Sequence, residues 1–146
     1  MRKEDVILIA DNDKKHVELI RENLLRAGLR NKMLHLADGG EVLDFLSDMD
    51  KGLEGQRNKQ EYILLLDIGI SGVDGVEVLE KIKQDAKLKR IPVIILTATD
   101  DPHTIERCHN LGCSTYIVKP TGHEDFEDTV HKIGHFLSVI EITSIK

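Results

Sequence analysis

Short apolar runs alternate with longer amphipathic segments along this chain. The runs cover residues 6–10, 33–37, 62–66, 91–96 and 116–118. Most of them are nearly unbroken stretches of Val, Ile and Leu, which is typical of strands buried on both faces of a parallel sheet. The segments between the runs are long enough to form helices. The pattern therefore predicts an α/β domain in which strand and helix alternate five times.

The segments between the runs carry apolar residues at helical spacing, together with residues that begin or end helices. We expect helices over about 13–27 and 39–47, from about 74 onward, over about 102–111, and from about 122 or 124 to 140. Gly28 and Gly112 follow the first and fourth of these helices and are expected to end them. Residues 50–60 are polar and contain glycine, so they predict a long loop before the third strand, either functional or mobile.

The chain has 146 residues, which is the size of one domain, and the alternation of elements uses all of it. We therefore expect residues 1–146 to form a single domain with no separate output domain. Hydrophobic residues make up 40% and charged residues 32%, as in an ordinary soluble protein. Cys108 and Cys113 have neither the spacing of a redox pair nor that of a metal site, so we expect reduced, structural thiols.

Charge and composition narrow the choice of partners. A net charge of −6, an aromatic content of 3% and the absence of Trp argue against a nucleic-acid surface. No apolar stretch approaches the ~20 residues that a bilayer requires, and the first residues lack the apolar segment of a signal peptide. We expect a cytoplasmic protein whose partners include neither nucleic acid nor a membrane.

Polar side chains follow four of the five predicted strands. Asp11 and Asp67 come directly after the first and third runs, Thr97 after the fourth, and Lys119 after the fifth. Ligands of open parallel sheets bind outside the carboxyl ends of the strands, which meet at one edge. Two carboxylates, a hydroxyl group and a lysine are thus expected at that edge. This set suits a site that handles a cation and a phosphoryl group.

The motifs around these residues resemble those of two-component response-regulator receiver domains. They are Leu-Leu-Asp-Ile-Gly-Ile-Ser-Gly-Val-Asp-Gly at 65–75, Leu-Thr-Ala at 96–98 and Val-Lys-Pro at 118–120. The resemblance extends from residue 6 to about residue 139. The long segment before the third strand and the absence of an output domain look most like the stand-alone receivers associated with bacterial phytochromes. The resemblance implies a flavodoxin-like (βα)5 fold, a doubly wound parallel sheet of strand order 2-1-3-4-5.

The resemblance also implies a phosphoryl-transfer site. Asp67 would accept a phosphoryl group from a sensor histidine kinase, in a reaction where positioning and charge neutralisation do most of the work. Lys119 would pair with the phosphoryl oxygens as a compact charge, and Thr97 would offer its hydroxyl group to the same oxygens. A cis peptide bond before Pro120, usual in the family, would aim the lysine into the site. Such a protein accepts and loses its own phosphoryl group, so we expect no enzyme acting on external substrates.

The metal site implied by the resemblance holds Mg²⁺, an ion that takes oxygen ligands and keeps several waters. Its protein ligands would be Asp11, Asn12, Asp67 and the carbonyl group of Gly69. The family normally carries a second carboxylate where this chain has Asn12, so we expect weaker Mg²⁺ binding. A register shift of one residue would instead bring Asp13 to the metal, because an unbroken apolar strand does not define its register by alternation. Without that shift, Asp13 is expected to cap the following helix.

A signalling role implies a surface that responds to phosphorylation. In the family, the residue that matches Tyr116 turns inward when the Thr97 hydroxyl swings toward the phosphoryl group. The alternative for Tyr116 is a half-buried strand tyrosine whose hydroxyl group is satisfied. The face formed by the fourth helix, fifth strand and fifth helix would then meet a downstream protein partner or form a homodimer.

Other functions fit the residues less well. No GxGxxG motif opens the first helix, which argues against a dinucleotide site, and Gly69 stands where a haloacid-dehalogenase-like phosphatase needs a second acid. His131 and His135 have helical spacing, but no Glu or Cys completes a zinc set, so we expect solvated side chains. The remaining alternative is a pseudo-receiver that binds partners without phosphorylation. Only Asn12 supports it, and Mg²⁺-dependent acyl-phosphate formation at Asp67 separates the two.

Overall fold

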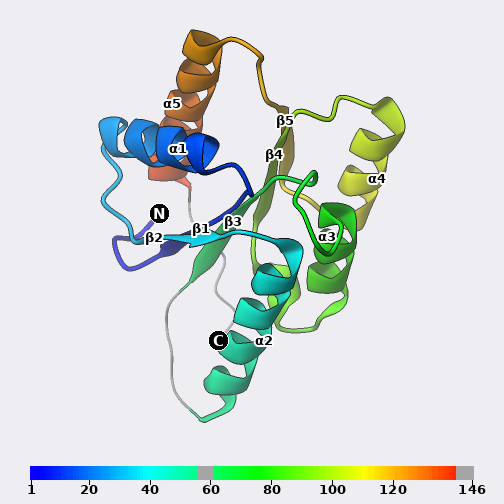
Figure 1. The fold of residues 1–146 in the computed structure, drawn as a ribbon. Helices are drawn as coiled ribbons and strands as arrows, with labels where there is room; N and C mark the ends of the chain where they lie inside the picture. Colours follow the sequence, from blue (N-terminus) through cyan, green and yellow to red (C-terminus); the bar gives the residue numbers. More distant parts are fainter. Residues whose placement is uncertain (56–60, 141–146) are drawn as a thin grey trace.

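Five parallel strands form the central sheet of the computed structural model, which describes residues 1–55 and 61–140 (Figure 1). The strand order is β2-β1-β3-β4-β5, and every neighbouring pair is parallel. The predicted flavodoxin-like topology is confirmed. The strands are β1 (Val6–Ala10), β2 (Met33–Leu36), β3 (Tyr62–Leu66), β4 (Val93–Thr97) and β5 (Thr115–Val118).

Helices cover both faces of this sheet. The helices are α1 (Lys14–Arg26), α2 (Gly39–Gly55), α3 (Gly75–Gln84), α4 (Pro102–Leu111) and α5 (His123–Val139), with a short 3₁₀ turn, η1, at Leu88–Arg90. Helices α1 and α5 lie on one face, and α2, α3 and α4 lie on the other (Figure 1). This doubly wound arrangement produces two apolar layers, one on each side of the sheet.

The two layers explain why the strands show little alternation of apolar and polar residues. Along β1, Leu8 belongs to the layer under α2 and α3, whereas Ile7 and Ile9 belong to the layer under α1 and α5. All five residues of β1 are buried, and so are all five of β3. A strand with helices on both sides must be apolar at every position.

The predicted helix ends are largely confirmed. The Asp13 carboxylate accepts the backbone N–H of Lys15 at 2.9 Å and therefore caps α1. Gly112 ends α4 with φ of 105°, a left-handed conformation that glycine adopts without the steric penalty of a side chain. Across residues 1–55 and 61–140, no helix combines the length and the apolar character that crossing a bilayer requires.

Helix α2 is longer than the sequence pattern suggested. It continues to Gly55 and does not end near residue 47, so the described part of the predicted 50–60 loop is helical, and this part of the prediction is wrong. No proline interrupts the segment, and its Lys, Leu and Glu residues favour helix. The glycines alone were not sufficient to end the helix. Residues 56–60 of the predicted loop lie outside the described residues.

Candidate functional site

The carboxyl ends of four strands bring the polar strand-end residues together. Asp11 follows β1, Asp67 follows β3, and Lys119 follows β5; Thr97 is the last residue of β4 and not the first residue after it. Strands β1 and β3 pair Ala10 with Leu66, so the two aspartates leave the sheet side by side. The backbone N–H of Lys119 donates to the Thr97 carbonyl oxygen at 2.7 Å, which continues the β4–β5 pairing into the site.

Lys119 is the centre of the site. Its Nζ lies 2.8 Å from Oδ2 of Asp11 and 2.9 Å from Oδ2 of Asp67. Lys119 and Asp11 are only 7% and 2% exposed. Because a buried ammonium group is stable only when anions compensate it, the two carboxylates hold Lys119 between them.

The Asp67 carboxylate is held by three hydrogen-bond donors. Oδ1 accepts the hydroxyl hydrogen of Thr97 at 2.6 Å and the backbone N–H of Gly69 at 2.9 Å, while Oδ2 faces Lys119. Burial pushes the pKa of Asp67 upward, but the hydrogen bonds from Thr97, Lys119 and Gly69 outweigh it and leave the pKa below its ordinary value. Asp67 is therefore ionised at neutral pH.

The structure separates the roles of the residues at the end of β1. The backbone N–H of Asp67 donates to the Ala10 carbonyl oxygen at 2.9 Å, so the register places Asp11 beside Asp67. Asp11 also accepts the backbone N–H of Asp13 at 2.9 Å through Oδ1. The Asp13 carboxylate is committed to the N-terminus of α1, as the unshifted alignment predicts. Asn12, between them, is exposed.

The oxygen donors at this edge fit a hard divalent cation. The carboxylates of Asp11 and Asp67 both face the position that Lys119 Nζ occupies. Asn12 and Gly69 are exposed beside them, and each can add a neutral carbonyl oxygen. An all-oxygen set of this kind suits Mg²⁺ or Mn²⁺ better than a soft metal.

The family comparison decides what kind of domain this is. Residues 7–131 match the family of response regulator receiver domains. This chain is a response regulator receiver domain. It is similar to response regulator Rcp1 of Synechocystis sp. (strain ATCC 27184 / PCC 6803 / Kazusa), with 30% identity over 131 residues that cover 90% of this chain and 87% of Rcp1.

Solved structures agree with this assignment. The Mn²⁺-bound form of Rcp1 has a TM-score of 0.79 at 26% identity and covers 96% of this chain and 99% of its own. The phosphorylated cyanobacterial phytochrome response regulator RcpA has a TM-score of 0.82 at 28% identity, with the same coverage of 96% and 99%. The predicted resemblance to phytochrome-associated receivers is confirmed.

Two histidines that the sequence patterns did not single out also lie in the receiver site. His16, in the first turn of α1, has its Nδ1 3.0 Å from Lys119 Nζ. His35, in β2, donates from Nε2 to the backbone carbonyl oxygen of Asp11 at 2.7 Å. A sequence signal existed for both. His16 follows the predicted cap by three residues, so it lies in the first helical turn beside the site, and His35 is the one polar residue in its apolar run.

Tyr116 of the receiver lies in β5 and is half-buried. Its hydroxyl group donates to the backbone carbonyl oxygen of Thr99 at 2.7 Å. Burial raises the pKa of Tyr116 to about 12, with smaller contributions from nearby thiol and carboxyl groups. A satisfied hydroxyl group matches the expectation for a half-buried strand tyrosine, and the switch role remains a prediction.

The peptide bond before Pro120 is trans, as are the other peptide bonds of the described residues, so the expected cis bond is not present. Even before proline, the trans form is the more stable one. The expectation rested on the family resemblance alone, and the local sequence does not require it.

The remaining candidate groups are structural or solvated. Cys108 and Cys113 are free and buried, and burial raises the pKa of Cys108 to about 11. Both are buried free thiols, in agreement with the predicted structural role. His131 and His135 contact each other at 3.1 Å on α5, and within residues 1–55 and 61–140 no group of three His, Cys, Asp or Glu residues could hold a metal ion.

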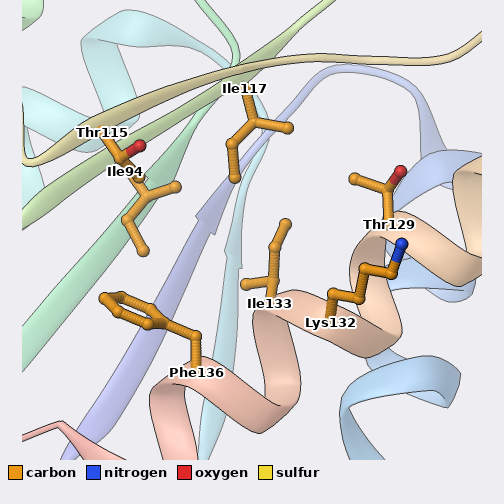
Figure 2. A pocket seen from close by; sticks show the side chains of 7 residues that line it. All are labelled: Ile94, Thr115, Ile117, Thr129, Lys132, Ile133 and Phe136. Carbon is orange, nitrogen blue, oxygen red and sulfur yellow. The ribbon is translucent and has the colours of Figure 1, made fainter.

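A separate apolar pocket lies between the β5 edge and α5 (Figure 2). Its volume is about 340 Å³, and Ile117 of β5 faces Ile133 and Phe136 of α5 across it (Figure 2). The Phe136 side chain is 52% exposed, and Val139 one turn later is 78% exposed. The other lining residues are Ile94, Thr115, Thr129 and Lys132.

Proposed function

We propose that this receiver domain accepts a phosphoryl group on Asp67 from a sensor histidine kinase and passes the signal on through the face of α4, β5 and α5. One observation carries the proposal. The ionised Asp67 carboxylate lies between the buried ammonium group of Lys119 and the hydroxyl group of Thr97. A cation and a hydroxyl group beside a nucleophilic carboxylate are the groups that a transferred phosphoryl requires.

In the proposed transfer, an oxygen of Asp67 forms a bond to the phosphorus atom as the bond from phosphorus to the kinase histidine breaks. The electron pair of the broken bond stays on the histidine nitrogen, which is then protonated. Lys119 and Thr97 pair with the phosphoryl oxygens. Since the product stays on the domain until it hydrolyses, no external substrate is turned over.

A divalent cation, Mg²⁺ by the chemistry of its ligands, would be held by Asp11, Asn12, Asp67 and the carbonyl group of Gly69. When bound, the ion neutralises charge between the carboxylate and the phosphoryl oxygens. The Mn²⁺-bound structure of Rcp1 supports a divalent metal in the family. Asn12 provides a neutral oxygen where a carboxylate would add charge, so this receiver binds the ion more weakly than one with two adjacent carboxylates.

The proposed domain passes its signal on by contact with another protein. Movement of Thr97 toward the phosphoryl group would free Tyr116 to turn inward and change the surface of β5. Exposed apolar side chains on α5, Phe136 and Val139, and the pocket beside Phe136 favour a protein partner, or a second copy in a homodimer, on this face. A domain that receives its phosphoryl group from a sensor histidine kinase would be cytoplasmic.

Intact-mass spectrometry tests the proposal. The protein is incubated with acetyl phosphate, with and without Mg²⁺, beside an Asp67→Asn control. A single phosphoryl adduct that requires Mg²⁺ and is absent from the control is the expected result. Folded protein that gains no adduct at any Mg²⁺ concentration would support the alternative, a phosphorylation-independent interaction module, for which Asn12 is the supporting residue.

A further inference from the structure

The ammonium group of Lys119 has a third partner. Besides Asp11 and Asp67, its Nζ lies 3.0 Å from Nδ1 of His16. We propose that His16 is a positioning residue, whose neutral imidazole nitrogen Nδ1 accepts a hydrogen bond from the Lys119 ammonium group and holds it in place for the phosphoryl oxygens. This inference rests on the proposed phosphoryl transfer at Asp67.

The chemistry of the lysine determines the direction of this bond. An ammonium group has three N–H donors and no acceptor. Two of the donors go to carboxylates at 2.8 and 2.9 Å, so the third goes to His16. Nδ1 must therefore accept, and the neutral imidazole of His16 carries its hydrogen on Nε2.

The surroundings of His16 favour that tautomer and orientation. Nε2 lies 3.6 Å from Oδ2 of Asp13, so a hydrogen on Nε2 has a carboxylate nearby. The imidazole ring lies 5.1 Å from the ring of Phe126 in α5, tilted by 49°. Because α1 holds the backbone of His16 and Phe126 limits rotation of its ring, the acceptor is aimed at Lys119 before any phosphoryl group arrives.

A neutral acceptor suits this position better than a third carboxylate would. Lys119 already faces two anions, and another charge would compete with the phosphoryl oxygens for the ammonium group. The His16 nitrogen orients the flexible lysine side chain and leaves its charge available. The expected consequence is a faster transfer step with little effect on Mg²⁺ binding.

Two substitutions of His16 test separately the contribution of its Nδ1 acceptor and that of its aromatic ring. His16→Phe keeps an aromatic ring beside Phe126 and removes the acceptor, whereas His16→Asn places an amide oxygen near the position of Nδ1 and removes the ring. The helix propensities of His, Phe and Asn are similar, so α1 is equally favoured in all three proteins. At mildly alkaline pH, we expect His16→Phe to slow Mg²⁺-dependent phosphorylation by acetyl phosphate about tenfold, and His16→Asn to recover most of the rate.

A second measurement does not depend on phosphorylation. In protein labelled with ¹⁵N at lysine, hydrogen exchange slows for an ammonium group whose three donors are all bonded, so the Lys119 Nζ signal should be visible in the wild type and in His16→Asn but lost in His16→Phe. A Lys119→Met variant identifies the signal. Equal rates and equal signals in all His16 variants would overturn the inference, and so would a His16→Asn variant as impaired as His16→Phe, which would assign the effect to ring contacts.

The two readouts also distinguish failure of this inference from failure of the proposed function. If the wild type gains no phosphoryl group, the proposed function fails, and the Lys119 signal alone still tests the contact with His16. If the wild type is phosphorylated and the His16 variants match it in rate and signal, only the inference about His16 fails.

Discussion

Thr97 donates its hydroxyl hydrogen to Oδ1 of Asp67 across 2.6 Å. Thr97 is the last residue of β4 and is only 1% exposed, so this hydroxyl group has little access to water. The contact links β4 to the Asp67 carboxylate. A change at the Asp67 carboxylate therefore alters the hydrogen bond of the Thr97 hydroxyl group. The two residues can be tested as a pair.

Thr97→Val removes the hydroxyl group and keeps the shape of the side chain. We expect the pKa of Asp67 to rise and the free energy of unfolding at neutral pH to fall by about 1.5 kcal/mol, the contribution of one hydrogen bond to a charged group. A carboxyl group whose pKa is lowered by folding stabilises the protein above its unfolded pKa, and this stability is lost as the pH falls through the folded pKa. The difference between wild type and variant should therefore shrink as the pH falls below 3.8, the ordinary pKa.

The pKa of Asp67 is read from the chemical shift of its carboxyl carbon, and stability from urea unfolding followed by circular dichroism. Thr97→Ser, which keeps the hydroxyl group, is the control and should leave the Asp67 pKa low. An unchanged Asp67 pKa in Thr97→Val would show that this hydrogen bond does not hold the carboxylate.

Lys119→Met removes the cation between two carboxylates. Asp11 and Asp67 then face each other without a counter-charge, and we expect the free energy of unfolding to fall by about 3 kcal/mol in the presence of a chelator. Added Mg²⁺ should restore part of this loss, because a bound cation stabilises the folded state by mass action. Urea unfolding with and without Mg²⁺ measures both effects.

Lys132→Met is the matched control for this change. Lys132 lies on α5 and pairs with Asp128 at 3.1 Å, but its side chain is 77% exposed. An exposed pair of this kind contributes little, so the control should change stability by less than about 0.5 kcal/mol. A Lys119→Met protein as stable as the control would contradict the view that the buried cation holds the site together.

Asn12→Asp adds the carboxylate that this receiver lacks. We expect the dissociation constant for Mn²⁺ to fall by about tenfold or more, because a hard cation binds an anionic oxygen more strongly than a neutral one. Electron paramagnetic resonance of free Mn²⁺ measures the binding without a tryptophan signal, which this chain does not offer.

Asp13→Asn is the companion variant, since Asn caps a helix about as well as Asp. If Asp13 only caps α1, as its bond to Lys15 indicates, metal affinity should stay unchanged. A large loss of Mn²⁺ affinity in Asp13→Asn, with none gained in Asn12→Asp, would instead make Asp13 the ligand.

Tyr116→Phe removes the hydrogen bond to the Thr99 carbonyl oxygen. At neutral pH we expect a loss of about 1 kcal/mol in the free energy of unfolding. Folding raises the pKa of Tyr116 from 10.0 to about 12, so the folded state keeps the phenol proton to higher pH. Its contribution is complete below pH 10.0 and is lost as the pH rises toward about 12.

The stability difference between wild type and Tyr116→Phe should therefore decrease over that range in urea unfolding experiments. The ultraviolet absorbance of phenolate gives the pKa of Tyr116 directly, and the Tyr116 signal should be absent from the variant. Ionisation of Tyr116 with an unshifted pKa would mean that its hydroxyl group is not held as the structure describes.

Local sequence patterns predicted most of the fold because the signals that define strands and helix ends act over a few residues. The unbroken apolar runs identified β1 and β3, and Asp13 and Gly112 marked the ends of α1 and α4. The prediction failed at the end of α2, where a polar, glycine-containing segment was interpreted as a loop although several of its residues favour helix. It favoured Asn12 as the metal ligand but kept Asp13 as an alternative, since an unbroken apolar strand does not define its register by alternation.

The sequence by itself determined that Asp11, Asp67, Thr97 and Lys119 would reach one edge of a parallel sheet, because each follows or ends a strand and all strands of a parallel sheet point the same way. Only the tertiary structure decided which of them touch. Lys119 meets Asp11 across 108 residues of sequence and His16 across 103. Those contacts depend on the strand order and on α1 and α5 sharing one face of the sheet, and no local pattern encodes how distant side chains meet once the chain is folded.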